Sequence, residues 1–77
     1  MASLVYFRKV AEADGSVEYV FGPDPAETSR LLIMDTAVRR ARPADGTVDH
    51  AFLKASRKIN ALYDASARWP EHGVSAS

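Results

Sequence analysis

Apolar residues recur at helical spacing in the last third of the chain. This period of about 100° per residue predicts an amphipathic helix over residues 47–68 with one buried stripe. Thr47 is suited to the N-cap after the Asp45-Gly46 turn, and Pro70 prevents continuation of the helix. Trp69 then either folds back as a cap on the core, which we favour, or serves as an exposed contact. The stripe consists of Val48, Phe52, Ala55, Ile59, Leu62, Tyr63 and Ser66.

Two segments nearer the N-terminus have the composition of β-strands. Residues 4–11 and 17–21 are rich in β-branched and aromatic side chains. Asp14-Gly15 between them is a strong signal for a tight turn, because glycine tolerates the positive φ that such a turn requires. The two segments therefore predict a β-hairpin.

The register of this hairpin depends on the length of its turn. A two-residue loop places Val10 opposite Tyr19. If Ser16 joins the loop, Ala11 faces Tyr19 instead and two glutamates oppose each other, so we favour the first register. That register divides the side chains between two faces: Leu4, Tyr6, Val10, Val17, Tyr19 and Phe21 on one, and Val5, Phe7, Ala11 and Val20 on the other.

Residues 25–41 admit two interpretations. The run Gly22-Pro23-Asp24-Pro25 ends the second strand, because proline cannot donate to a ladder. The next segment is either one helix over residues 25–41 or a turn that leads into a third strand over residues 30–36. The strand is favoured, because four successive apolar residues would cover most of the helix circumference and a lone hairpin needs a third strand. Residues 37–46 then form a basic loop.

These elements predict the α+β fold class. The sheet has three antiparallel strands, the hairpin and the third strand, and packs against one C-terminal amphipathic helix in the order ββ(turn)βα. Residues 1–70 form a single α+β domain, as expected for so short a chain. Residues 71–77 are small and polar, so we expect a frayed tail.

Composition narrows the function classes. The 77 residues include no cysteine and carry a formal net charge of zero, with the basic residues concentrated in residues 30–68. A disulfide framework and a thiolate nucleophile are therefore excluded. The chain has no leader-like segment and no apolar run near the ~20 residues that span a bilayer, so we expect a cytoplasmic protein without a membrane partner.

Residues that carry chemistry are few and scattered. His50 lies on the polar side of the predicted helix and His72 in the predicted tail, too far apart for a metal site without cysteine. Ser56 lacks the turn that exposes a nucleophilic serine, and the four glycines are isolated, so no phosphate-binding loop exists. We expect no enzyme activity, no cofactor and no metal.

Basic residues offer one binding function. A basic loop and one face of the helix could contact phosphates, which makes a nucleic-acid-binding module the alternative function. The sequence pI of about 6.7 is low for such a domain. The candidate phosphate contacts are Arg39, Arg40, Arg42, Lys54, Arg57 and Lys58.

Apolar residues predict a different function, which we favour. One helix covers only one face of the sheet, so the other face would expose apolar side chains that suit a protein partner or a homodimer. The third strand contributes Leu32 and Met34 to this face in one pairing with the hairpin, and Leu31 and Ile33 in the other. The candidate protein-contact face is Val5, Phe7, Val20, Leu32 and Met34, with Leu53 from the helix as a further contact.

Two runs carry a resemblance. Phe52-Leu53-Lys54-Ala55-Ser56-Arg57-Lys58-Ile59 and Arg68-Trp69-Pro70-Glu71 stand in a chain rich in Ala, Arg and Asp. Over less than half its length, the chain resembles small uncharacterised actinobacterial proteins of unknown function. The resemblance implies a bacterial, cytoplasmic origin and transfers no site residue.

Overall fold

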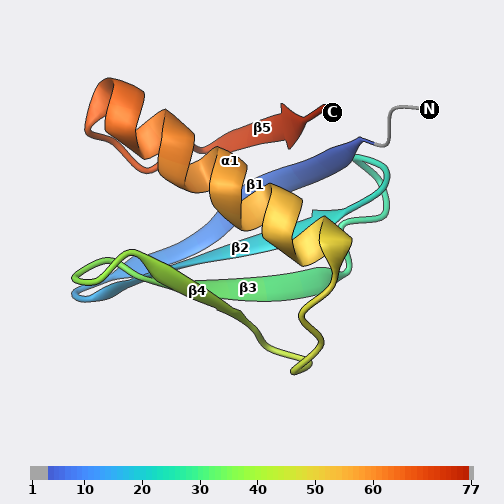
Figure 1. Ribbon diagram of the computed structural model, residues 1–77, viewed down its shortest axis with the longest axis horizontal. Coiled ribbons are helices and arrows are strands. Elements are labelled where there is room, and N and C mark those ends of the chain that lie inside the picture. The colour runs from blue at the N-terminus through green and yellow to red at the C-terminus, as the bar shows by residue number, and fades with distance from the viewer. Residues whose placement is uncertain (1–3, 77) are drawn as a thin grey trace.

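The computed structural model describes residues 4–76 as one curved sheet with one helix against it (Figure 1). All neighbouring strands are antiparallel, and their order across the sheet is β4-β3-β2-β1-β5. Successive turns join the first four strands, and the chain then passes through α1 and returns beside β1. The elements are β1 (Val5–Ala13), β2 (Ser16–Gly22), β3 (Arg30–Asp35), β4 (Arg40–Pro43), α1 (His50–Ser66) and β5 (His72–Ser75).

The predicted α+β class, with an antiparallel sheet and one helix, is confirmed, and β3 confirms a strand in place of the helix over residues 25–41. The prediction of three strands is wrong, because the described residues form a five-stranded sheet. The expected basic loop contains β4, and the expected frayed tail contains β5. Both are four-residue edge strands of low strand propensity, and they form because β3 and β1 offer unpaired backbone groups on which they can pair.

The hairpin has a two-residue turn and a β-bulge. Next to the turn, Ala13 pairs with Ser16, as the favoured register predicts. The ladder then slips between Lys9 and Ala11, so that Lys9, and not Val10, lies opposite Tyr19. Both predicted registers are therefore wrong beyond the bulge, since one unpaired residue moves every later side chain to the other face.

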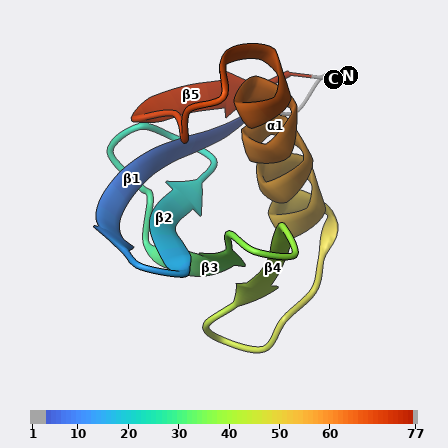
Figure 2. The same ribbon diagram turned by 90° about the vertical axis from the view of Figure 1, so that its left-hand side faces the viewer.

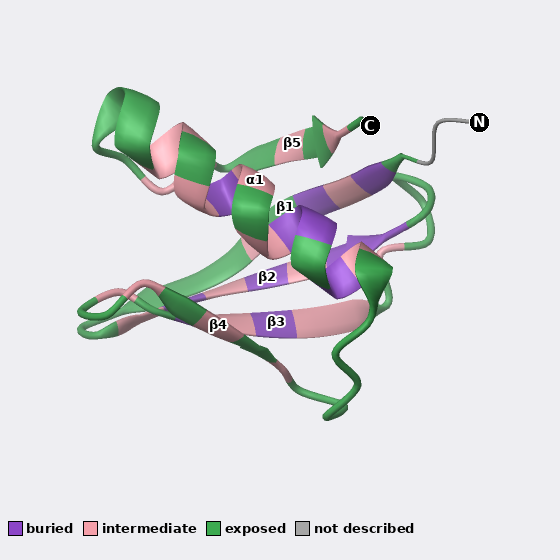
Figure 3. Cartoon of the chain, viewed as in Figure 1, coloured by how far each residue is buried: buried purple, intermediate pink, exposed green. Residues whose placement is uncertain are grey.

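The core lies between α1 and the concave face of the sheet (Figures 2 and 3). Phe7 and Tyr19 meet edge to face with ring centroids 5.8 Å apart, and Phe21 and Phe52 are 6.3 Å apart. Alternate residues of β1, β2 and β3 meet one face of the helix. The buried apolar residues are Val5, Phe7, Val17, Tyr19, Phe21, Leu32, Met34, Phe52, Ala55 and Ile59.

The helix is shorter than predicted at both ends. Its N-cap is Asp49 and not Thr47, because the Asp49 carboxylate accepts a hydrogen bond of 3.0 Å from the Phe52 N–H. It ends at Ser66, because the C-cap residue Ala67 has a left-handed φ of 58° and donates its N–H to the Tyr63 carbonyl, so the helix stops before Pro70. Val48 is consequently outside the helix and exposed.

The segment after the helix folds back onto the core. Trp69 stacks on Tyr63 with ring centroids 4.3 Å apart and packs against the buried cluster, which confirms its predicted role as a cap. The Tyr19 hydroxyl donates a hydrogen bond of 2.6 Å to the Pro70 carbonyl. Burial raises the pKa of Tyr19 far above its usual value. These contacts direct the chain into β5.

Arg30 holds the other end of the helix. Its guanidinium donates to Asp45 at 2.9 Å, to Asp49 at 2.8 Å and to the Thr47 carbonyl at 2.9 Å, and it lies 4.7 Å from the centre of the Phe21 ring. Hydrogen bonds from Arg30 lower the pKa of both carboxyl groups. One side chain of β3 thus fixes the loop before α1 and the capping residue of α1.

Replacement of Gly73 by alanine tests whether β5 is part of the folded domain. An added Cβ would lie 2.6 Å from the end of the buried Phe7 ring, so we expect Gly73→Ala to lower the free energy of unfolding by about 1–2 kcal/mol. Urea unfolding followed by tryptophan fluorescence measures the change. Ser75→Ala, in the same strand, is the control and should be close to neutral. Equal stability of Gly73→Ala and the parent protein would show that β5 does not pack as described.

Replacement of Arg30 by alanine tests the link between β3 and the helix N-terminus. We expect Arg30→Ala to lower the free energy of unfolding at neutral pH by about 1 kcal/mol, since several charge-assisted hydrogen bonds to one partly buried group are lost. Urea unfolding at several pH values measures the loss, with the exposed Arg57→Ala as control.

The pH dependence of this loss has a definite sign. The pKa values of Asp45 and Asp49 are lower in the folded state than the ordinary 3.8, so their ionised forms stabilise the fold above that pH. This contribution disappears as the pH falls through the lowered folded-state pKa values. The difference between Arg30→Ala and the parent protein should therefore shrink in strong acid, and a difference independent of pH would contradict the assignment.

Candidate protein-contact site

The sheet face turned away from α1, which we call the outer face, is not covered by a helix in residues 4–76 (Figure 2). Strand register places its side chains in rows: Val20 lies beside Leu31, and Ile33 lies in the next row. Tyr6 and Val74 are partners across β1 and β5. These five residues, all incompletely buried, form what we call the outer patch.

Charged residues of both signs surround the outer patch. Ile33 has Glu18 as its partner on one side and Arg42 as its partner on the other. Arg8 is the partner of Val20 across β1 and β2. None of these three charged residues forms an ion pair with another described residue. An apolar centre with an unpaired polar rim is the composition of a protein interface.

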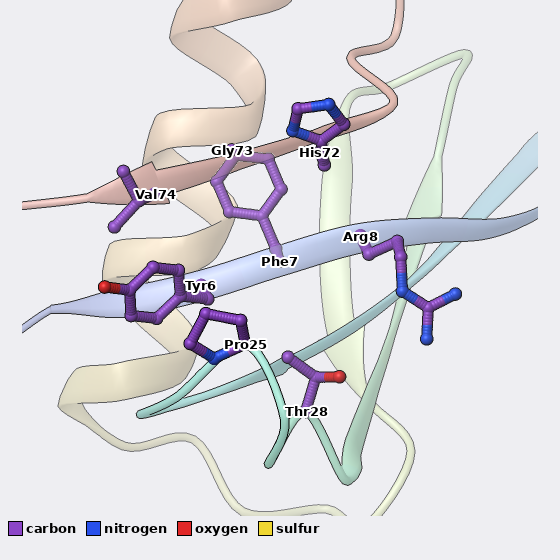
Figure 4. Close-up of a pocket in the computed structure, with 8 residues that line it drawn as sticks. All are labelled: Tyr6, Phe7, Arg8, Pro25, Thr28, His72, Gly73 and Val74. Carbon is purple, nitrogen blue, oxygen red and sulfur yellow. The ribbon is translucent and has the colours of Figure 1, made fainter.

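A groove of about 370 Å³ opens at the β5 side of the outer face (Figure 4). The loop over residues 23–29 forms one wall because it folds tightly over Gly22, where a Cβ would lie only 1.8 Å from the Glu27 carbonyl oxygen. Tyr6, Val74 and Pro25 line one end of the groove, and Arg8 and His72 lie at the other (Figure 4). The groove is also lined by Phe7, Thr28 and Gly73.

The cationic end of the groove lacks a counter-charge. Arg8 and His72 are direct cross-strand partners, both exposed, and neither forms an ion pair with a described residue. Glu71, the acidic residue immediately before β5, instead forms an ion pair with Lys9 at 3.3 Å. The Arg8 guanidinium at this end of the groove is therefore without a counter-charge among the described residues.

The edge of β5 is also open. The Lys9 N–H donates to the Glu71 carbonyl at 2.7 Å, so Glu71, Gly73 and Ser75 turn their backbone groups toward β1. By the same alternation, His72 and Val74 turn theirs toward the free edge. Among the described residues β5 is the terminal strand of the sheet, so this edge can accept a further strand.

Most of the predicted protein-contact face is in the core. Val5 and Phe7 are only 4% and 2% exposed, and Leu32 and Met34 are fully buried, so the prediction that they are exposed is wrong. The bulge turned Val5 and Phe7 inward, and pairing of β3 with β2 turned Leu32 and Met34 to the same side. Val20 does lie on the outer face. Leu53 is exposed on α1, away from that face.

The sequence analysis made no prediction of Tyr6 and Val74 in the outer patch. Of the two pairs it allowed on β3, the favoured Leu32 and Met34 are buried, while the alternative Leu31 and Ile33 lie on the outer face. The sequence of β1 did indicate which side faces solvent. Tyr6 shares its side of the strand with the charged Arg8, whereas the side with Val5 and Phe7 carries no charge before Lys9. A charged residue favours the solvent side of a sheet. No comparable signal marked Val74, because β5 exists only by pairing with β1.

The candidate phosphate contacts are divided among different surfaces. Arg40 and Arg42 lie on β4 with their side chains on the outer face, whereas Arg39 turns to α1. Arg39 forms an ion pair with Asp64 at 2.6 Å and lies 5.2 Å from the centre of the Tyr63 ring. In α1, Lys54 is only 7% exposed, so it does not share a basic surface with the exposed Arg57 and the half-buried Lys58.

Residues that could support catalysis stay apart. His50 begins α1 and His72 begins β5, and both are exposed. Within residues 4–76, no three His, Asp or Glu side chains gather closely enough to hold a metal ion. No helix in this same range is long and apolar enough to cross a membrane.

Comparison with known proteins adds no constraint. The chain matches no protein-family model, no curated protein and no solved structure.

Proposed function

We propose that this protein is a non-enzymatic protein-contact module that binds another protein surface through its outer face. The observation that carries the proposal is the outer patch, in which Val20, Leu31 and Ile33 stand on adjacent strands beside unpaired charges. Neighbouring apolar side chains on a solvent-facing sheet lose unfavourable hydration when a second surface covers them.

The charge pattern suits a second copy of the chain. Glu18 and Arg42 flank Ile33 in one row across β2, β3 and β4. In a two-fold symmetric contact, the same patch meets itself, so Glu18 of one chain can approach Arg42 of the other while the two Ile33 side chains pack centrally. A patch with both signs is self-complementary, whereas a patch with one sign would repel its own copy.

Nucleic-acid binding has weaker support. Arg8, Arg40 and Arg42 share the outer face, but Glu18 and Asp35 lie among them. A surface that follows a phosphate backbone needs a continuous positive stripe, since each carboxylate on it repels the same phosphates. The division of the other candidate phosphate contacts between α1 and β4 further separates the charges.

Sedimentation equilibrium tests self-association through the outer patch. We expect the parent protein to show an average mass that rises with concentration, and Ile33→Asp to remain monomeric, because a carboxylate at the centre of an apolar contact is costly to bury. Val38→Asp, at a 64% exposed position in the loop before β4, is the control and should associate like the parent. Leu53→Asp tests the helix contact that the sequence suggests and should have no effect.

Amide spectra separate the competing functions. Concentration-dependent shifts at Val20, Leu31 and Ile33 support the outer patch. Salt-sensitive shifts on addition of oligonucleotides, confined to Arg40, Arg42 and the basic helix residues, would contradict it and favour nucleic-acid binding. Unchanged mass together with an unchanged spectrum at high protein concentration would contradict the second copy as partner.

A further inference from the structure

We propose that the free edge of β5 and the adjoining groove bind an extended segment of a different protein. This segment carries an acidic side chain and a large apolar side chain two residues apart. The inference rests on the proposed function, that the module acts through protein contacts, and it names a second contact and the chemistry of its partner.

The backbone supplies the first part of the site. His72 and Val74 direct their N–H and carbonyl groups away from β1, as the Lys9–Glu71 hydrogen bond establishes. An extended segment that pairs with them adds a sixth strand to the sheet. Such pairing supplies affinity through main-chain hydrogen bonds and leaves selectivity to the side chains, which alternate between the two faces.

The apolar end of the groove determines which side chain of the bound segment fits opposite Val74. A residue paired with Val74 at the free edge places its side chain on the outer face beside Val74, so only a long side chain reaches over Val74 toward Tyr6, with Pro25 of the loop as the far wall of the groove (Figure 4). The volume of about 370 Å³ exceeds what a single large side chain needs. A small side chain would leave the floor exposed, so the site selects a long aliphatic or aromatic residue.

The cationic end of the groove determines which side chain of the bound segment fits opposite His72. A residue opposite His72 lies two positions from the apolar one and on the same face, because strand side chains repeat every second residue. There it meets His72, with Arg8 on the next strand (Figure 4). A carboxylate at this position supplies the counter-charge that the described residues do not provide.

A second copy of β5 fits this edge poorly. Two β5 strands paired about Gly73 would place His72 of each chain opposite Val74 of the other, with no carboxylate at the cationic end. The neighbouring acid, Glu71, is already engaged by Lys9.

A short peptide provides the test. The probe is acetyl-Lys-Thr-Glu-Thr-Phe-Thr-Lys-amide, titrated into the full ¹⁵N-labelled chain and followed by amide spectra. We expect the largest shifts at His72, Val74 and Arg8 and slower solvent exchange of the His72 and Val74 amides. The same peptide with glutamine in place of glutamate should bind about tenfold more weakly, as expected for loss of a charge-assisted hydrogen bond.

Two protein variants make the test specific. Arg8→Glu should weaken binding of the glutamate peptide by at least about tenfold, because the end of the groove changes sign. Arg57→Glu makes the same charge change on the exposed side of α1 and should leave binding unchanged. A lysine-containing peptide in place of the glutamate peptide should regain affinity for Arg8→Glu, which shows that this variant is folded and that charge is the cause.

Several outcomes would overturn the inference. They are the absence of shifts at millimolar peptide, shifts that avoid β5, equal binding of both peptides, and shifts of the β5 amides when Ile33→Asp, which does not associate through the outer patch, is concentrated without peptide. The last outcome would make a second copy the occupant. If the peptide fails to bind while Ile33→Asp still abolishes self-association, only this inference is wrong and the proposed function stands.

Discussion

A one-residue irregularity in β1 determines which side chains build the core. Beyond the bulge between Lys9 and Ala11, Val5 and Phe7 point toward α1, and Tyr6 and Arg8 point away from it. Without the bulge the two sets would exchange faces. An arginine would then enter an apolar core, at a high cost of desolvation, and two apolar side chains would face solvent. The bulge therefore creates the core and the charged end of the groove together.

A side chain of β3 and a side chain of the turn between β3 and β4 hold the helix at its two ends. Arg30 binds the capping residue Asp49 at the N-terminus, while Arg39 binds Asp64 near the C-terminus. Trp69 adds a third contact, because its ring stacks on Tyr63 of the helix at the point where the chain returns to the sheet. A single helix on a small sheet buries little area, so such fixed attachments limit how far it can slide across the concave face.

The same geometry explains why the outer face is available. One helix covers only the concave side, and on the outer face the loop over residues 23–29 folds over Gly22 and forms one wall of the groove. The outer patch, the unpaired charges around it and the open edge of β5 are therefore adjacent on one side of the molecule. The patch suits a flat apolar surface, whereas the edge suits an extended segment, so the two contacts make different demands on a partner.

The sequence by itself determined the elements whose signals are local: the hairpin turn at Asp14-Gly15, the third strand, one amphipathic helix and the cap by Trp69. Only the tertiary structure decided which side of each strand faces α1. These strands carry apolar residues on both sides, and the register with the neighbouring strand determines which set is buried. The tertiary structure also decided β4 and β5, whose residues have weak strand propensity and become strands by pairing with distant neighbours. The groove joins residues from β1, β5 and a loop, and no local pattern in any one of these segments encodes their meeting.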